Sequence, residues 1–416
     1  MSISKETEVL VVGAGPVGLC TGLMLAERGI RVEIIDQHWR TSAHSYALAL
    51  HPSSLQTLDE LGLAHELVEE GHCVEKVLYY EGMVPRAEVA YAKLPGHFPF
   101  LLILAQDALE GALETRLAKK GVKVHWNHRA GFFDAEAPEL TVRVDKLTQE
   151  SVGYAITHSG WVVDRTFEVR PRFIVGTDGQ HSVVRRHLGL DFQEQGHADM
   201  FAVFEFETDG TASPEVRVIF DGRFTNVLWP QRGGRYRWGF QLPEDQVTEP
   251  RSKNPLAVQI HDRTYPYLGR EQLTSFIADR ASWFDPPIGE IIWSLGVRFE
   301  RRLVDQFGKG WAWLAGDAAH LAGPVGVHSM NVGLREARDV ADRLYRILRE
   351  GHGPETLKDY DQERLSEWRS LLTGKARVLD GADPWVSEYA DRLVHCVPAS
   401  GSDLHVLLGE LGLALE

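Results

Sequence analysis

The feature that constrains this chain most is a glycine-rich turn, GAGPVG, at residues 13–18. It follows Glu8–Val12 (EVLVV), a short apolar run typical of a buried parallel strand. It opens a helical stretch that ends at Gly29, and Arg31–Ile35 then predicts a second strand. A glycine turn between a strand and a helix is typical of dinucleotide-binding units. We therefore predict a βαβ unit of this kind at the start of the sequence.

Each position of the turn has a physical role in this prediction. Gly13 allows the tight turn, Gly15 lets the backbone approach a diphosphate, and Gly18 lets helix and strand pack closely. Asp36, with Gln37 beside it, ends the second strand and can accept hydrogen bonds from an adenosine ribose, which favours FAD or NAD over NADP. The alternative is a plain turn and a surface aspartate. We expect the diphosphate to lie against the start of the helix, on the segment Gly13, Ala14, Gly15, Pro16, Val17 and Gly18.

Two later segments also place an aspartate at the end of a predicted strand. Phe173–Arg185 (FIVGTDGQHSVVR) contains Asp178, although an Asp-Gly pair taken alone is more simply a common turn. Trp311–Gly333 (WAWLAGDAAHLAGPVGVHSMNVG) contains a Gly-Asp pair ending at Asp317, followed by a loop and a helix start. The Asp317 carboxylate could bind a polyol or cap the next turn, and this segment alone favours neither role.

Between these βα segments the pattern changes to that of antiparallel strands. Residues 199–245 contain alternating runs such as EVRVIF and RYRWGFQLP with turns between them, and Thr141–Gln193 predicts short strands. The segment after Asn331 predicts an amphipathic helix, and the tail from Thr356 is mostly helical. The predicted fold class is therefore α/β, with a discontinuous Rossmann-like domain, an inserted antiparallel β-sheet and C-terminal helices.

In order and spacing, the three motifs resemble the FAD-dependent aromatic hydroxylase family, the class A flavoprotein monooxygenases of the para-hydroxybenzoate hydroxylase fold. Gln106 (in QDALEGAL) and Tyr360 with the following Glu-Arg pair match two further marks of that family, so the resemblance extends from about Val9 to Arg364. It implies that FAD-binding segments occupy residues 1–75, 101–190 and 301–350. It also implies a substrate sheet at 76–100 and 191–300, and C-terminal helices at 351–416.

The resemblance also implies roles for individual residues. The glycine turn and Asp36 would hold the FAD diphosphate and adenosine ribose, Gln106 and Asp317 the ribityl chain, and Asp178 would lie near the diphosphate. The other predicted FAD contacts are Gly316 beside Asp317, Pro324 and Gly326 along the isoalloxazine, and the amides near Met330 and Asn331 at its pyrimidine edge.

Aromatic side chains in the inserted sheet are candidates for the substrate pocket, foremost Trp229 and Trp238. Ordinary sheet core is the alternative for each. Alternation places Tyr236, Trp238 and Phe240 on one face of their strand and Arg235 and Arg237 on the other, so both faces cannot line the pocket.

The implied reaction is hydroxylation of an aromatic or polyketide-like small molecule by O2 through a flavin C4a-hydroperoxide. FAD would be non-covalent. NADH or NADPH would bind transiently as reductant, since there is no second glycine fingerprint. No catalytic base is identifiable. Halogenation is disfavoured because the WxWxIP motif of flavin halogenases is not evident.

Three departures from the family pattern keep a rival hypothesis open. Tyr46 stands where relatives have Arg, Val327-His328-Ser329 replaces Gly-Gln-Gly, and Glu336 replaces Asp. The rival is a protein that binds FAD and an aromatic ligand without redox turnover, or another flavin oxidoreductase of the same superfamily.

Charge and cysteine content exclude other classes. The chain has 44 Lys and Arg against 59 Asp and Glu, a net charge of −15, which disfavours nucleic acid and anionic membrane surfaces. Three separated cysteines predict neither a disulfide framework nor a zinc site, and no metal site is expected. The longest nearly apolar stretch, Val17–Ala26, is too short to span a membrane, and no secretory signal is evident. We expect a cytoplasmic monomer or homodimer.

Overall fold

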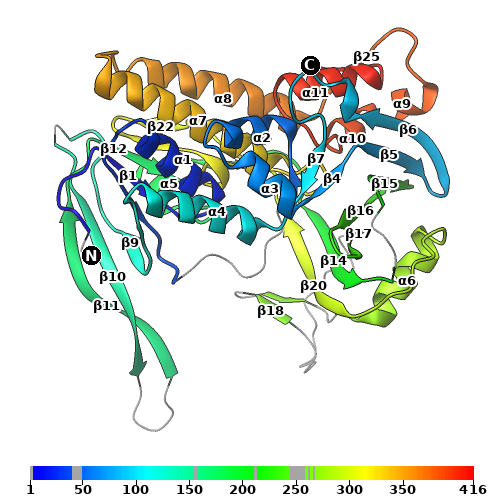
Figure 1. Cartoon of the computed structure of the whole chain (residues 1–416), viewed down its shortest axis with the longest axis horizontal. Helices are drawn as coiled ribbons and strands as arrows, with labels where there is room; N and C mark the ends of the chain where they lie inside the picture. The colour runs from blue at the N-terminus through cyan, green and yellow to red at the C-terminus, as the bar shows by residue number, and fades with distance from the viewer. Residues whose placement is uncertain are drawn as a thin grey trace.

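The computed structural model describes residues 3–39, 49–137, 139–152, 158–209, 213–243, 258–260, 263–265 and 268–416. Its centre is a six-stranded sheet in which β1 pairs in parallel with β2 and β12 (Figure 1). The order is β22 (Gly308–Lys309), β23 (Ala312–Leu314), β12 (Phe173–Gly176), β1 (Val9–Val12), β2 (Val32–Ile35) and β8 (Val124–His125). Strands from distant parts of the chain therefore end at one edge of this sheet, as in a Rossmann-like domain.

Helix α1 (Pro16–Glu27) leaves the carboxyl end of β1 and packs against two later helices, α4 (Gln106–Lys119) and α7 (His328–Arg349). Pro16 suits the first turn of α1 because it needs no amide hydrogen there. Gly29, with φ of +71°, follows the last turn, as the sequence predicts. Most of α1 is buried, so the glycine turn is attached to a helix in the core of the domain.

The second large sheet is the predicted inserted sheet. Its order is β20 (Ile291–Phe299), β14 (Asp199–Glu207), β17 (Arg235–Leu242), β16 (Phe224–Gln231), β15 (Glu215–Asp221), β5 (Lys76–Glu81) and β6 (Val84–Ala90). One face packs beneath α6 (Arg270–Arg280), where Phe204, Trp238 and Phe240 form a core with Phe276. The other face carries Phe201, Val203 and Trp229, which belong to the core shared with the α/β domain.

Two long strands project from the α/β domain, β10 (Val142–Val152) and β11 (His158–Val169), with β9 (His128–Ala130) alongside β10 (Figure 1). The sequence predicts several short strands here, and that prediction is wrong. The charged residues that suggested breaks are cross-strand partners in the hairpin, as in the Lys146–Asp164 ion pair of 2.8 Å.

Smaller elements complete the fold. Three short sheets are formed by β3 (Ala49–Leu50), β7 (Leu101–Ile103) and β4 (His72–Val74), by β13 (Phe192–Glu194), β21 (Arg302–Val304) and β24 (His320–Leu321), and by β18 (Val258–Ile260) and β19 (Arg263–Tyr265). The remaining short helices are α2 (Pro52–Asp59), α3 (Ala64–Glu70), α5 (Val183–His187) and the 3-10 turns Tyr91–Lys93 and Gly316–Ala318.

The C-terminal part is helical, as predicted; α8 runs along α7, and the later short helices lie near β5 and β6 of the inserted sheet (Figure 1). It comprises α8 (Thr356–Thr373), α9 (Pro384–Glu388), α10 (Ala390–Val394) and α11 (Ser402–Glu410), with β25 (Ala376–Val378) paired to β26 (Leu413–Leu415). Tyr79 of β5 donates a hydrogen bond to the Cys396 carbonyl at 3.2 Å. The predicted α/β fold class is confirmed. Within the described ranges, no helix has the length and apolar character that a membrane span requires.

Candidate functional site

Of the three glycines in the turn, two are too closely packed to accept a side chain and one, Gly15, is not. A Cβ on Gly13 would lie 2.4 Å from the Thr177 carbonyl oxygen, and Gly13 has φ of +108°. A Cβ on Gly18 would lie 2.0 Å from the Gly13 carbonyl oxygen. A Cβ on Gly15 would meet no atom within 4 Å. Gly13 and Gly18 therefore hold strand and helix together, while Gly15 faces open space.

The start of α1 presents its backbone amides to that space. Gly15 is the N-cap residue, and among the described residues no side chain caps the helix there. The Asp36 carboxylate, at the end of β2, accepts hydrogen bonds from the Ala14 and His38 amides, each at 2.8 Å. Gln37 is exposed beside it. A helix start of this kind favours an anion such as a diphosphate.

Asp178 follows β12 at the same edge of the sheet. Its carboxylate accepts hydrogen bonds from the Ser182 hydroxyl and from the Val183 amide at 2.6 Å, so it supports the start of α5. Burial raises its pKa, and these hydrogen bonds oppose the rise. Arg185 in α5 donates to the Ala318 carbonyl at 2.8 Å. The Asp178 motif thus connects the turn after β12 to the turn after β23.

Asp317 lies in that second turn, Gly316–Ala318. Its neighbours Gly316 and Ala318 are buried, while Asp317 is exposed. Surrounding protein nevertheless limits the hydration of its carboxylate, and this burial raises its pKa. Both observations are explained if the carboxylate lies in a recess of the protein instead of on a convex surface.

A buried carboxylate, Glu336 of α7, fixes the backbone beside Asp317. It accepts hydrogen bonds from the Gly316 amide at 2.8 Å, His320 Nε2 at 2.8 Å and Trp368 Nε1 at 2.7 Å. The His320 ring stacks on Trp368 with centroids 3.7 Å apart. Burial would raise the pKa of Glu336, but the charge of His320 and the hydrogen bonds from His320, Gly316 and Trp368 lower it below its ordinary value. Glu336, which the sequence shows only as a departure from the family pattern, therefore supports the turn.

Gln106 begins α4 and donates a hydrogen bond to the Glu110 carboxylate at 2.6 Å. Glu110 is buried, which raises its pKa to about 7. Sequence reasoning missed Glu110. Its position one helical turn after Gln106 is the signal that could have identified it.

The loop Pro324–Val327 leads from the Asp317 turn into α7. Val327 has φ of +50°, a conformation that β-branched residues rarely adopt. The His328 side chain turns toward the C-terminal segment, where Nε2 contacts the Val397 carbonyl at 3.2 Å. Met330 is half-buried. The Asn331 side chain donates to the Ala49 and Val327 carbonyls, each at 2.8 Å, so it is used in holding the loop. Tyr46 lies outside the described residues.

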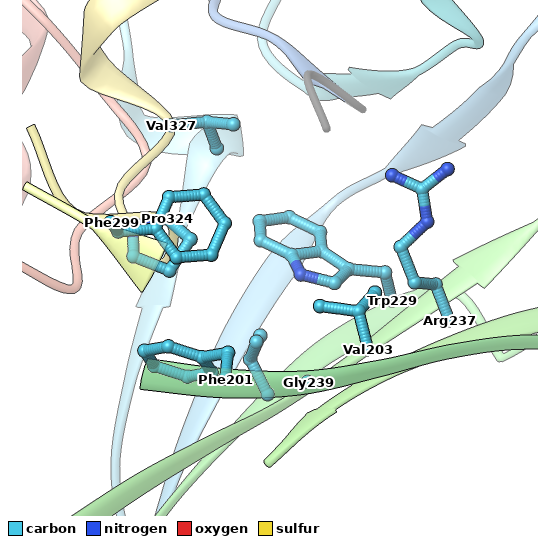
Figure 2. A pocket seen from close by; sticks show the side chains of 9 residues that line it. Phe201, Val203, Trp229, Arg237, Gly239, Phe299, Pro324 and Val327 are labelled. Atoms are coloured by element: carbon cyan, nitrogen blue, oxygen red, sulfur yellow. The ribbon is translucent and has the colours of Figure 1, made fainter. Parts of the chain in front are cut away.

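A cavity lies between this loop and the inserted sheet (Figure 2). About 410 Å³ of space lies between its walls, including space that is open to solvent. Its walls are Phe201, Val203, Val227, Trp229, Arg237, Gly239, Phe299, Pro324 and Val327. Of the two predicted substrate contacts, Trp229 lines the cavity. Trp238 is on the opposite face of the sheet, beneath α6, because side chains alternate along β17.

Three buried or half-buried histidines surround the same loop. His51 Nε2 contacts the Gly326 carbonyl at 3.0 Å, which requires a proton on that nitrogen, and its Nδ1 lies 3.2 Å from the Ser400 hydroxyl. Burial lowers the pKa of His51 well below 6.5, that of His328 to about 4 and that of His395 to about 3. The folded protein therefore keeps these rings neutral.

This arrangement predicts that the protein loses stability in acid. The unfolded chain binds protons at these histidines from about pH 6.5 downward, whereas the folded chain does not. Their contribution to stability is therefore fully present above that pH and is lost below it. Each histidine contributes ~1.4 kcal/mol per pH unit within its window. His328→Gln should flatten the dependence of the unfolding free energy on pH between 6.5 and 4. Equal slopes in the variant and the wild type would contradict this prediction.

Comparison with known proteins adds three findings. The model of a family described as "FAD binding domain" matches residues 6–374. The chain is 29% identical over 375 residues to a 6-methylpretetramide 4-monooxygenase of Streptomyces rimosus, covering 88% of this chain and 60% of that protein. It is 24% identical over 414 residues to a 3-(3-hydroxy-phenyl)propionate/3-hydroxycinnamic acid hydroxylase of Mycolicibacterium gilvum, covering 96% of this chain and 65% of that protein. The chain thus spans less than two thirds of the length of these curated relatives.

Solved structures show the same fold. A p-nitrophenol 4-monooxygenase from Pseudomonas putida superposes with a TM-score of 0.71 at 22% identity, covering 98% of this chain and 97% of that one. An aklavinone-11 hydroxylase, solved with FAD and aklavinone, gives a TM-score of 0.68 at 22% identity, covering 90% and 68%. At this identity the likeness concerns the fold.

Proposed function

The chain belongs to the FAD binding domain family, FAD is its cofactor, and from this premise we propose that it is a monooxygenase that hydroxylates an aromatic or polyketide-like small molecule, with NADH or NADPH as reductant. The relatives named above are hydroxylases and monooxygenases of such molecules. When bound, FAD would supply the redox chemistry that links oxidation of the nicotinamide to the use of O2.

The residues at the edge of the six-stranded sheet fit FAD. The open space before Gly15 and the uncapped amides of α1 suit the diphosphate. We propose that Asp36 binds the adenosine ribose. Asp317, recessed at the end of the neighbouring β23, and Gln106 are proposed to bind the ribityl chain. Pro324, Gly326 and the amides at the start of α7 are then proposed to lie along the ring system.

The observation that carries the proposed reaction is a single cavity with two kinds of wall. Pro324 and Val327 form one wall and belong to the loop that continues from the Asp317 turn, while the inserted sheet forms the other (Figure 2). Phe201, Trp229 and Phe299 make the interior apolar and aromatic. Such walls would bind a flat ring and exclude water from it, and the oxygen chemistry that FAD would supply requires a dry space.

Two measurements test this function together. In air, a suitable ligand should stimulate NAD(P)H oxidation by the FAD-loaded protein. Without oxygen, NADH or NADPH should bleach the absorption band of oxidised flavin at about 450 nm within seconds. A folded, FAD-loaded protein that neither nucleotide bleaches, even with a tightly bound ligand, would favour binding without redox turnover.

Asp317→Ala is expected to weaken FAD binding by about tenfold or more, since a hydrogen bond to a charged group contributes ~1.5–3 kcal/mol. Because the residue is exposed in its recess, the melting temperature of the cofactor-free protein should barely change. Asp285→Ala, which removes an exposed carboxylate after α6, is the matched control and should leave FAD binding unchanged. Titration of FAD fluorescence measures both. Equal affinities for the two variants would count against a role for Asp317 in binding FAD.

A further inference from the structure

Four side chains form a row across the inserted sheet, on the face that carries the cavity. Trp293 of β20 is paired with Glu205 of β14, Glu205 with Arg237 of β17, and Arg237 with Trp229 of β16. Residues directly opposite one another on antiparallel strands contact each other. The two central members of the row are oppositely charged.

Glu205 and Arg237 form a buried ion pair. Arg237 Nη2 and Nε donate to one Glu205 carboxylate oxygen at 2.7 and 3.0 Å, and each side chain is only 9% exposed. Trp293 Nε1 donates to the same oxygen at 3.1 Å, and the Arg237 guanidinium lies 4.9 Å from the Trp293 ring centroid. Several interactions thus hold the guanidinium in place.

Nine described residues line the cavity, and of these nine Arg237 is the one with a charged side chain. It lies beside Trp229 at one end, and Pro324 and Val327 lie across the cavity from it (Figure 2). A ligand in this space therefore meets a guanidinium at one end and the proposed cofactor loop at the other. Glu205 already balances the charge of that guanidinium.

This inference rests on the proposed function, in which the cavity is the substrate site. We propose that the Glu205–Arg237 pair selects a substrate that is uncharged at this wall and offers a carbonyl or phenolic oxygen to Arg237. Such an oxygen accepts a charge-assisted hydrogen bond without adding charge. A substrate carboxylate would bring a second anion to a cation that is already paired, in an apolar space where an unbalanced charge is costly. Neutral hydroxyquinone-like molecules are thus preferred to aromatic acids.

The test compares two ligands of similar shape, the neutral 4,5-dihydroxyanthraquinone-2-carboxamide and the anionic 2-carboxylate. Binding to the oxidised, FAD-loaded protein is followed by quenching of tryptophan fluorescence, with no reductant present. Wild-type protein should bind the carboxamide at least about tenfold more tightly. Glu205→Gln removes the carboxylate that pairs with Arg237, so the ligand carboxylate should gain at least about tenfold relative to the carboxamide.

Glu215→Gln is the matched control. Glu215 pairs with Arg217, two residues along β15 of the same sheet, at 2.7 and 2.9 Å, and Arg217 lies over Trp283 as Arg237 lies over Trp293. Neither residue is among those lining the cavity. This variant should keep the wild-type preference.

A second variant covers the case in which Glu205→Gln does not fold. The double variant Glu205→Gln/Arg237→Met removes both charges and should weaken carboxamide binding about tenfold or more, because the ligand oxygen loses its donor. Three results would overturn the inference. The wild type could bind the carboxylate as tightly as the carboxamide or more tightly, it could bind neither ligand, or folded Glu205→Gln could keep the wild-type preference. Because no reductant is present, a protein that shows the preference but inserts no oxygen would contradict only the proposed function.

Discussion

Replacing Gly15 with alanine is expected to lower FAD affinity on the order of a hundredfold while the chain keeps its fold. Gly15 has φ of −73°, which alanine adopts readily, and its added Cβ would touch no protein atom within 4 Å. The space that the methyl group would enter is where the diphosphate is proposed to approach the backbone. Titration of FAD against the purified variant measures the loss, and wild-type affinity would contradict the proposed site.

Gly18→Ala should have the opposite profile. Its Cβ would lie 2.0 Å from the Gly13 carbonyl oxygen and 2.6 Å from the Thr177 hydroxyl, so strand and helix would be forced apart at a cost of about 3 kcal/mol in unfolding free energy. Gly111→Ala in α4 makes the same chemical change where no atom lies within 4 Å, and it should be neutral or stabilising. Thermal unfolding of the three variants separates damage to the cofactor site from damage to the fold.

Glu336→Ala is expected to cause the largest loss of stability, about 3–5 kcal/mol. Its removal leaves three buried donors without their acceptor, namely the Gly316 amide, His320 Nε2 and Trp368 Nε1. Because the turn carrying Asp317 depends on this carboxylate, FAD affinity should fall as well. Denaturant unfolding measures the effect, with the exposed Glu388→Ala as control. A loss below about 1 kcal/mol would show that the network contributes little.

The same carboxylate gives a second, separate pH dependence. The pKa of Glu336 is lowered in the folded protein, so its contribution to stability is fully present above its ordinary value of 4.5 and is lost as the pH falls through the lowered value. Glu336→Gln removes this dependence while keeping an acceptor. Comparing it with His328→Gln, whose effect lies mainly between pH 6.5 and 4, distinguishes the two groups.

Local signals predicted the parts of this protein that depend on neighbours in sequence. Gly13, Gly15 and Gly18 predict the turn because strand, turn and helix are contiguous, and the alternation from Arg235 to Phe240 correctly separates the two faces of β17. Which face lines the cavity depends on α6, which covers Trp238 and leaves Arg237 on the other side. Nothing within the strand itself carries that information.

Long-range pairs could not be predicted for the same reason. Glu336 reaches the Gly316 amide 20 residues away, and His51 contacts Ser400 across 349 residues. Glu205 and Arg237 become partners only because β14 and β17 are adjacent in the sheet. The sequence alone thus indicated the fold class and FAD as the cofactor, but not the polar network beside the cavity.

The most direct test of the proposed chemistry is the fate of labelled oxygen. FAD-loaded protein, NADH or NADPH and a panel of neutral phenols and hydroxyquinones are incubated under 18O2, and products are analysed by mass spectrometry. We predict a product that carries one 18O atom, formed in step with nucleotide oxidation. A ligand that is transformed without 18O, or that takes its oxygen from labelled water instead, would contradict assignment of the chain as a monooxygenase.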